Sequence, residues 1–118
     1  MKIDLDEIQK EIIQNKINHG WPIDDINLEF NLLYGEVAEA FEAYNKKFAK
    51  EELGSELADV AIYLLGLADI LGFSLQDEIQ KKLEIIKHRK YVTVDGKTVK
   101  VDDRDWQTQR FVLKYFWG

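Results

Sequence analysis

Two pairs of acidic residues, each with a spacing of three, are the strongest candidates for chemistry in this sequence. Glu36 and Glu39 form the first pair, and Glu56 and Asp59 form the second. Residues three apart lie on the same side of a helix, so each pair projects in one direction. Positions 36 and 59 average to 47.5, as do 39 and 56, so a chain reversal near residues 46–48 sets Glu36 beside Asp59 and Glu39 beside Glu56. The spacing therefore predicts that four carboxylates meet on two antiparallel helices.

Carboxylates that are crowded into an apolar setting repel one another and lose hydration, and a divalent cation offsets both effects. Ligation by oxygen alone suits the hard ion Mg²⁺, with Mn²⁺ as the alternative. We therefore predict a magnesium site in which Glu36, Glu39, Glu56 and Asp59 serve as metal ligands and as catalytic residues. The alternative interpretation is that pairs with this spacing lie on a solvated helix face.

Helices must position these acids, and four segments have the required periodicity. Apolar residues recur with a helical period over about residues 4–18, 24–44, 50–71 and 75–89. Asp4 and Ser74 are the expected N-caps of the first and fourth helices, and Gly72 follows the third helix. Short connections favour antiparallel neighbours, so the predicted fold is all-α, an antiparallel four-helix bundle.

The two central helices are rich in apolar residues. One face of the second predicted helix carries Phe30, Leu33, Val37, Ala40, Phe41 and Tyr44. The third predicted helix is apolar on nearly every side, which is typical of a buried helix. We therefore expect the acids of the third helix to lie in a partly buried setting.

The character of the chain changes after residue 90. Two short β-prone runs flank Asp95-Gly96, a dipeptide that favours a type I′ turn, so a β-hairpin is predicted over residues 91–101. An aromatic tail follows, for which the sequence favours neither helix nor strand. We expect a single domain over residues 1–118, with a helical core over 1–90 and a hairpin and tail extension over 91–118.

Composition excludes several classes of function. The chain has 118 residues, 16 basic and 22 acidic side chains, a net charge of −6 and no cysteine. The acidic balance argues against binding to a nucleic acid polymer, and the lack of cysteine fits a reducing compartment. The N-terminus has no signal-peptide pattern, and the most apolar run, residues 57–72, is shorter than a membrane span. We expect a cytoplasmic protein with no membrane partner.

The order and spacing of the acidic motifs resemble the all-α nucleoside triphosphate pyrophosphatases, MazG-like branch, over about residues 15–91. Residues 33–40 are similar to that family's first motif, and residues 56–60 to its second. The resemblance implies hydrolysis of a nucleoside triphosphate to the monophosphate and pyrophosphate, with Mg²⁺ held by the four acids. It also implies a homodimer or homotetramer of helical bundles, which fits the exposed apolar patch that a free aromatic tail would create.

The resemblance extends to the fourth predicted helix. Lys82 and Arg89 match basic positions of the family and are expected to contact phosphate. Ile86 stands where the family has an asparagine, so a contact that depends on that amide is not expected here. The alternative interpretation is that both basic residues simply solvate the C-terminal turn of a helix.

Three further residues are matched to substrate binding through the resemblance. Trp21 corresponds to a base-stacking tryptophan, with Asn18 as a nearby polar partner, and Tyr63 occupies an aromatic position found in the deoxycytidine triphosphate pyrophosphatase relatives. Trp21 beside Pro22 could instead fasten the loop to the core.

The competing function is that of a non-catalytic helical oligomerisation module with a vestigial acidic site. Other classes lack their motifs. His19 and His88 do not have the Glu-x-x-His spacing of a di-iron bundle, and neither a Walker A motif nor a Nudix box is present.

Overall fold

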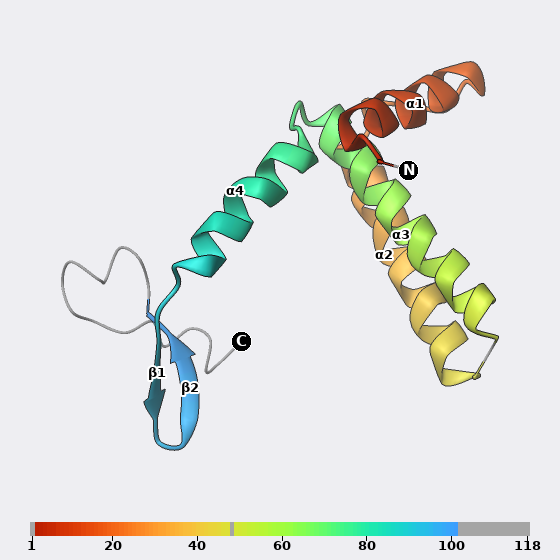
Figure 1. The fold of residues 1–118 in the computed structure, drawn as a ribbon. Coiled ribbons are helices and arrows are strands. Elements are labelled where there is room, and N and C mark those ends of the chain that lie inside the picture. Colours follow the sequence, from red (N-terminus) through yellow and green to blue (C-terminus); the bar gives the residue numbers. More distant parts are fainter. Residues whose placement is uncertain (1, 48, 102–118) are drawn as a thin grey trace. The chain divides into compact units, whose positions relative to one another are not determined.

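The computed structural model describes residues 2–47 and 49–101. Four helices and two strands occur in this part of the chain: α1 (Leu5–Asn18), α2 (Ile26–Asn45), α3 (Lys50–Ile70), α4 (Leu75–Lys87), β1 (Tyr91–Val94) and β2 (Lys97–Lys100) (Figure 1). The predicted helical class with an appended hairpin is therefore confirmed. The predicted aromatic tail lies outside the described residues. The chain divides into two compact units, residues 1–78 and 79–118, and the expected single domain stays a prediction.

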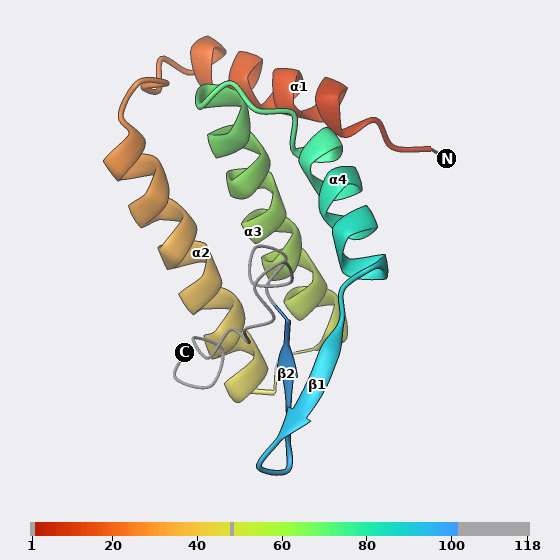
Figure 2. The same cartoon turned by 90° about the vertical axis from the view of Figure 1, so that its left-hand side faces the viewer.

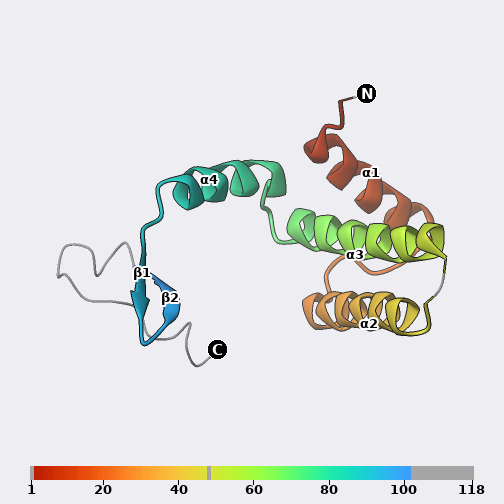
Figure 3. The same ribbon diagram turned by 60° about the horizontal axis from the view of Figure 1, so that its bottom comes forward.

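In the first unit, α2 and α3 lie side by side and run antiparallel, as Figures 1 and 3 show. Helix α1 packs across the C-terminal half of α3 (Figure 2). Its crossing point is Gly66, where an added Cβ would lie 3.0 Å from Ile12 Cγ2. The two helices approach this closely because residue 66 has no side chain.

Side-chain caps mark the start of three helices, and those at Asp4 and Ser74 are the predicted ones. The Asp4 side chain accepts hydrogen bonds from the first turn of α1, Asp25 accepts one from Leu28 N at the start of α2, and Ser74 Oγ accepts one from Asp77 N. Helix α4 ends at Lys87, slightly before the predicted end.

A buried glutamine fixes α1 to the connection between α3 and α4. Gln9 Nε2 donates to the carbonyl oxygen of Phe73 at 2.9 Å, and Gln9 Oε1 accepts from Leu75 N at 2.9 Å. The Ser74 hydroxyl also donates to Asp6 Oδ1 at 2.6 Å. The bond from Leu75 N satisfies one of the backbone N–H groups that the first turn of α4 itself leaves without a partner.

The core of the first unit is made mainly of small and branched side chains: Ala40, Ala43, Leu65, Leu67 and Ala68. The apolar face predicted for α2 is only partly the buried one, because Phe30, Val37, Phe41 and Tyr44 are 39–65% exposed. Glu56 and Asp59 of α3 are half-buried, as expected, but the helix is not buried as a whole, since Leu57, Ile62 and Leu64 are exposed in the single chain. Helix α3 has only α1 and α2 packed against it in this unit, which leaves part of its circumference uncovered.

In the second unit, β1 and β2 form the predicted antiparallel hairpin, with Val94 paired to Lys97. Asp95 has φ +51° and Gly96 has φ +75°. Two successive positive φ values are the requirement of a type I′ turn, so the turn prediction is confirmed.

Among the described residues no single helix is long and apolar enough to span a membrane. Only α3 and α4 taken together, with the break between them, pass that test by length and composition.

The close approach at Gly66 gives a test of the α1–α3 crossing. Gly66→Leu should lower the free energy of unfolding by about 1–3 kcal/mol, because the new side chain meets Ile12. Gly54→Leu, at an α3 position with open space around it, should be neutral or slightly stabilising because leucine forms helix better than glycine. Urea unfolding followed by circular dichroism measures both, and equal effects would contradict this packing.

Candidate functional site

Three of the four predicted acids converge between α2 and α3. Single carboxylate oxygens of Glu36, Glu56 and Asp59 all lie within 4.8 Å of one another. Glu36 comes from α2, and the other two come from successive turns of α3. The antiparallel pairing of these two helices therefore creates the cluster that the symmetric spacing predicts, and we call these three residues the carboxylate cluster.

The carboxylate cluster is short of hydrogen-bond donors. Glu36 Oε2 and Glu56 Oε2 are buried and have no hydrogen-bond partner in the described part of the chain. A buried acceptor without a partner is costly, and a buried carboxylate oxygen more so. Three half-buried carboxylates with two oxygens left over fit the all-oxygen ligation of a divalent cation such as Mg²⁺.

The pKa of Glu36 is consistent with the convergence of the acids. The pKa of the Glu36 carboxyl is raised above its usual 4.5, first by burial and then by the negative charges of Glu39, Asp59 and Glu56. Each of these causes disfavours the ionised form of Glu36. A cation at the cluster would act in the opposite direction and favour ionisation.

Glu39 lies at the margin of the carboxylate cluster. It is exposed and is not one of the three residues whose oxygens converge, although its charge acts on Glu36. Its carboxylate nevertheless lies close to that of Glu36, because Glu39 is the first of the charges that raise the pKa of Glu36. The pairing of Glu39 with Glu56 stays a prediction.

A pocket beside the cluster contains two of the predicted substrate-binding residues. Its volume is about 290 Å³, and its lining is Lys16, Trp21, Pro22, Leu28, Glu29, Leu32 and Tyr63. We call this the Trp21 pocket. Tyr63 lies one turn beyond Asp59 on α3, which places it between the pocket and the carboxylate cluster. Asn18 lines a different, wider depression with Glu11 and Asn15.

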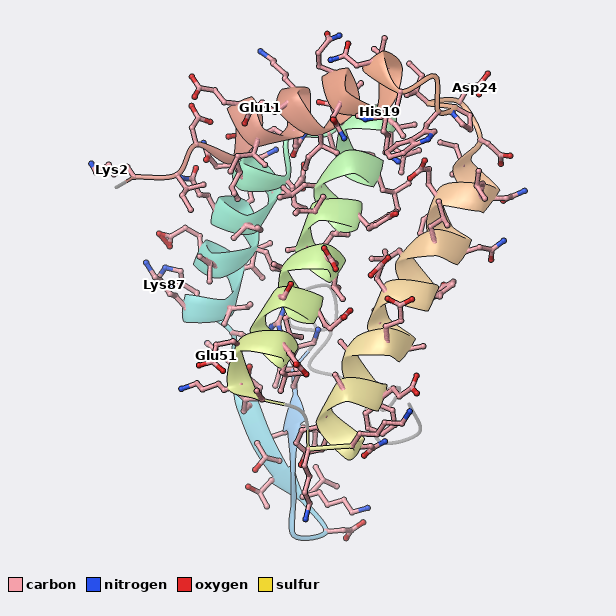
Figure 4. The ribbon with its side chains drawn as sticks, turned by 90° about the vertical axis from the view of Figure 1, so that its right-hand side faces the viewer. Lys2, Glu11, His19, Asp24, Glu51 and Lys87 are labelled. Atoms are coloured by element: carbon pink, nitrogen blue, oxygen red, sulfur yellow. The ribbon has the colours of Figure 1, made fainter. Side chains whose placement is uncertain are left out.

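The stick view of Figure 4 helps to locate these regions. Glu11 and His19 mark α1, and Asp24 lies on its connection to α2, whereas Glu51 lies at the opposite end of α3. His19 stacks on Trp21 with the ring centroids 4.8 Å apart, which holds the indole at the end of α1.

Sequence reasoning missed a buried ion pair in the wall of the Trp21 pocket. Lys16 Nζ lies 3.1 Å from Glu29 Oε1 and 3.3 Å from Glu29 Oε2, and the two side chains are only 11% and 2% exposed. A signal was present, because Lys16 continues the apolar stripe of Ile8 and Ile12 at a spacing of four. A charged residue at an apolar stripe position indicates either a buried partner or a site.

The predicted phosphate-binding residues Lys82 and Arg89 belong to the second unit. Lys82 is exposed and Arg89 is half-buried. Their role in phosphate binding stays a prediction.

A comparison with protein families adds an independent observation. The model of the family described as the MazG-like family matches residues 26–104, which include α2, α3 and the whole carboxylate cluster. No curated protein and no solved structure matches the chain.

Charge repulsion in the cluster makes a prediction about the metal-free protein. The pKa of the Glu36 carboxyl is higher in the folded protein than in the unfolded chain, so the protonated carboxyl favours folding. This contribution to stability is complete at pH values below the unfolded pKa and is lost as the pH rises through the folded pKa. Glu36→Gln should therefore raise the Tm by a few degrees at pH 7 in chelator and have little effect near pH 4.

Differential scanning calorimetry at the two pH values measures this difference. Glu51→Gln, which removes an exposed carboxylate outside the cluster, is the matched control and should leave the Tm nearly unchanged. A lower Tm for Glu36→Gln at pH 7 would mean that the ionised group is held by partners rather than repelled.

Proposed function

The chain belongs to the MazG-like family, and from this membership and the carboxylate cluster we propose that it is a metal-dependent nucleotide pyrophosphohydrolase. The proposed reaction converts a ribo- or deoxyribonucleoside triphosphate and water to the nucleoside monophosphate and pyrophosphate. The observation that carries the proposal is the convergence of Glu36, Glu56 and Asp59 with two buried oxygens that lack donors.

In this proposal Glu36, Glu56 and Asp59 bind Mg²⁺, or Mn²⁺ in its place, and Glu39 contributes from the solvent side. The ion would offset the charge of the triphosphate and lower the pKa of a nearby water molecule. Glu39 orients that water and accepts its proton, because it is the acid of the group that remains exposed. The water oxygen forms a bond to the α-phosphorus, the bond from that phosphorus to the bridging oxygen breaks, and pyrophosphate leaves.

The remaining predicted residues would hold the substrate. Trp21 and Tyr63 face a common pocket beside the cluster, which supports placing the base there. Lys82 and Arg89 would contact phosphate groups, and Asn18 would be a polar partner at the edge of the site. Most of the rate enhancement would come from positioning and electrostatic stabilisation.

We also propose that the protein forms homodimers or homotetramers of four-helix bundles. One stripe of α2 carries large apolar side chains at alternating spacings of four and three: Phe30, Tyr34, Val37, Phe41 and Tyr44. These side chains are 39–66% exposed in the single chain. Such a stripe has the spacing of a seam between packed helices, and exposed apolar patches of this kind mark interfaces.

The alternative of a scaffold with a vestigial acidic site is less well supported. A scaffold would gain nothing from burying Glu36 Oε2 and Glu56 Oε2 without partners, and it would retain the repulsion among the acids.

A substrate panel tests the proposed reaction. Each common ribo- and deoxyribonucleoside triphosphate is incubated with the protein and Mg²⁺, and the products are separated by ion exchange. We expect monophosphate and pyrophosphate in equal amounts from at least one nucleotide, and no products in the presence of chelator. Folded protein that releases monophosphate from none of them would refute the proposal.

The role of Glu39 has its own test. Glu39→Gln should lower kcat by at least about 100-fold while the circular dichroism spectrum stays that of the wild type. Glu51→Gln, the same change at an exposed α3 position outside the cluster, should leave kcat close to the wild-type value. Full turnover by Glu39→Gln would exclude Glu39 as the base.

The α2 stripe predicts the effect of a charge placed within it. Phe41→Glu should shift the protein to monomers in sedimentation velocity, because a carboxylate would be desolvated in the seam. Ile3→Glu, at another exposed apolar residue outside the stripe, should leave the assembly unchanged. A monomeric wild-type protein would contradict the proposed oligomer.

A further inference from the structure

The Trp21 pocket contains a buried ion pair that the proposed chemistry does not use. Its walls are largely apolar, yet Lys16 and Glu29 both line it, and Glu29 is the most buried charged residue described. Pockets that bind small molecules combine apolar walls with a few placed polar groups that fix the orientation of the ligand. The Lys16–Glu29 pair fits that description.

The pair is a costly way to connect α1 to α2. Removing two charges from water carries a large desolvation cost, and apolar side chains of similar volume often stabilise such a contact equally well or better. A purely structural role therefore leaves the choice of charged residues unexplained. A role in recognition explains it, because charged hydrogen-bonding groups give direction and selectivity.

Both head groups also keep hydrogen-bonding capacity. An ammonium group has three donors and a carboxylate has about four acceptor positions. In the described residues, the only side-chain hydrogen bonds of Lys16 and Glu29 are the two that join them. At least one donor of Lys16 and further lone pairs of Glu29 are therefore left for a ligand.

The aromatic residues of the pocket are held in place around this pair. Trp21 is fixed by stacking on His19 and by a hydrogen bond from its backbone N–H to the Lys16 carbonyl oxygen at 3.0 Å. Lys16 Nζ lies 5.4 Å from the centroid of the Tyr63 ring. A flat ring bound beside Trp21 and Tyr63 would have its edge near the ion pair.

The distance to the carboxylate cluster suits one nucleotide. Glu29 and Glu36 are seven residues apart on α2, which corresponds to two turns and about 10 Å along the axis. That separation is comparable to the reach from a base through its sugar to the first phosphate. The pKa of Tyr63, raised first by burial and then by Glu36 and Glu29, reflects its position between the two groups of acids.

Building on the proposed function, we infer that the Lys16–Glu29 pair selects the nucleobase of the substrate. Lys16 donates to a carbonyl oxygen or unprotonated ring nitrogen on the base edge, and Glu29 accepts from an adjacent N–H group. Bases whose donors and acceptors occur in the wrong order leave one of these buried groups without a partner and are rejected. Trp21 and Tyr63 contact the faces of the ring and do not distinguish one base from another.

The test compares kcat/KM for the deoxynucleoside triphosphates of cytosine, uracil, thymine, adenine and guanine. Each value is divided by that for 2-deoxyribose 5-triphosphate, which has no base and so reports the catalytic centre alone. The wild type should favour its best base over its worst by at least about tenfold. Lys16→Met/Glu29→Met, which removes both charges and leaves neither unpaired, should reduce that spread to about threefold or less.

A matched control uses the exposed ion pair of Glu42 and Lys46 on the same helix α2. Glu42→Met/Lys46→Met should keep the wild-type spread. If the pocket variant is folded and also keeps the wild-type spread, the pair is only a structural connection and the inference is wrong. Glu29→Gln is a second test, because it changes one acceptor oxygen to a donor. It should change the order of preferred bases rather than make the kcat/KM values equal.

A binding assay distinguishes failure of this inference from failure of the proposed reaction. Equilibrium dialysis of nucleoside 5′-monophosphates in chelator measures base selection without metal and without turnover. If the wild type hydrolyses nothing but binds monophosphates selectively, and Lys16→Met/Glu29→Met loses that selectivity, the proposed reaction fails and the inference survives. If the wild type shows no selectivity among bases in either assay, the inference is overturned even where hydrolysis occurs.

Discussion

The structure depends on holding several negative charges close together on two adjacent helices. Glu36, Glu56 and Asp59 repel one another, and burial of Glu36 adds to the cost. Their convergence is possible because α2 and α3 are held together by apolar packing elsewhere along their length. The free energy that packing provides must exceed the repulsion in the absence of a cation, and a bound cation would convert the same arrangement into a stabilising one.

Small residues make this close packing possible. Ala40 and Ala43 are the most buried apolar residues of α2, and Gly66 and Ala68 lie where α3 is covered. Short side chains let helix axes approach, so carboxylates on facing turns come within a few ångströms of each other. The same absence of bulk at Gly66 lets α1 cross α3 and delivers Lys16 and Trp21 to the end of the α2–α3 pair.

Much of this arrangement could be predicted from the sequence, because it depends on local rules. The caps at Asp4 and Ser74 and the Asp95-Gly96 turn follow from backbone chemistry within a few residues. The carboxylate cluster follows from one further assumption, an antiparallel pairing centred between the motifs. The buried partner of Lys16 could not be found this way, because it depends on how the connection after α1 turns back toward α2. The exposure of the α2 stripe could not be predicted for a similar reason, since periodicity identifies an apolar face without identifying what covers it.

The two inward-facing acids of α2, Glu29 and Glu36, have opposite electrostatic surroundings. Glu29 has a resident cation, the Lys16 ammonium at 3.1 Å, whereas the charges that act on Glu36 two turns later are those of other acids. If inward carboxylates served only to connect helices, both positions would be expected to have internal partners, because an unpaired buried charge is destabilising. This difference fits the substrate site of the proposed function. In that site the base end would need groups fixed before binding, and the phosphate end would need charge that an external cation and its substrate neutralise together.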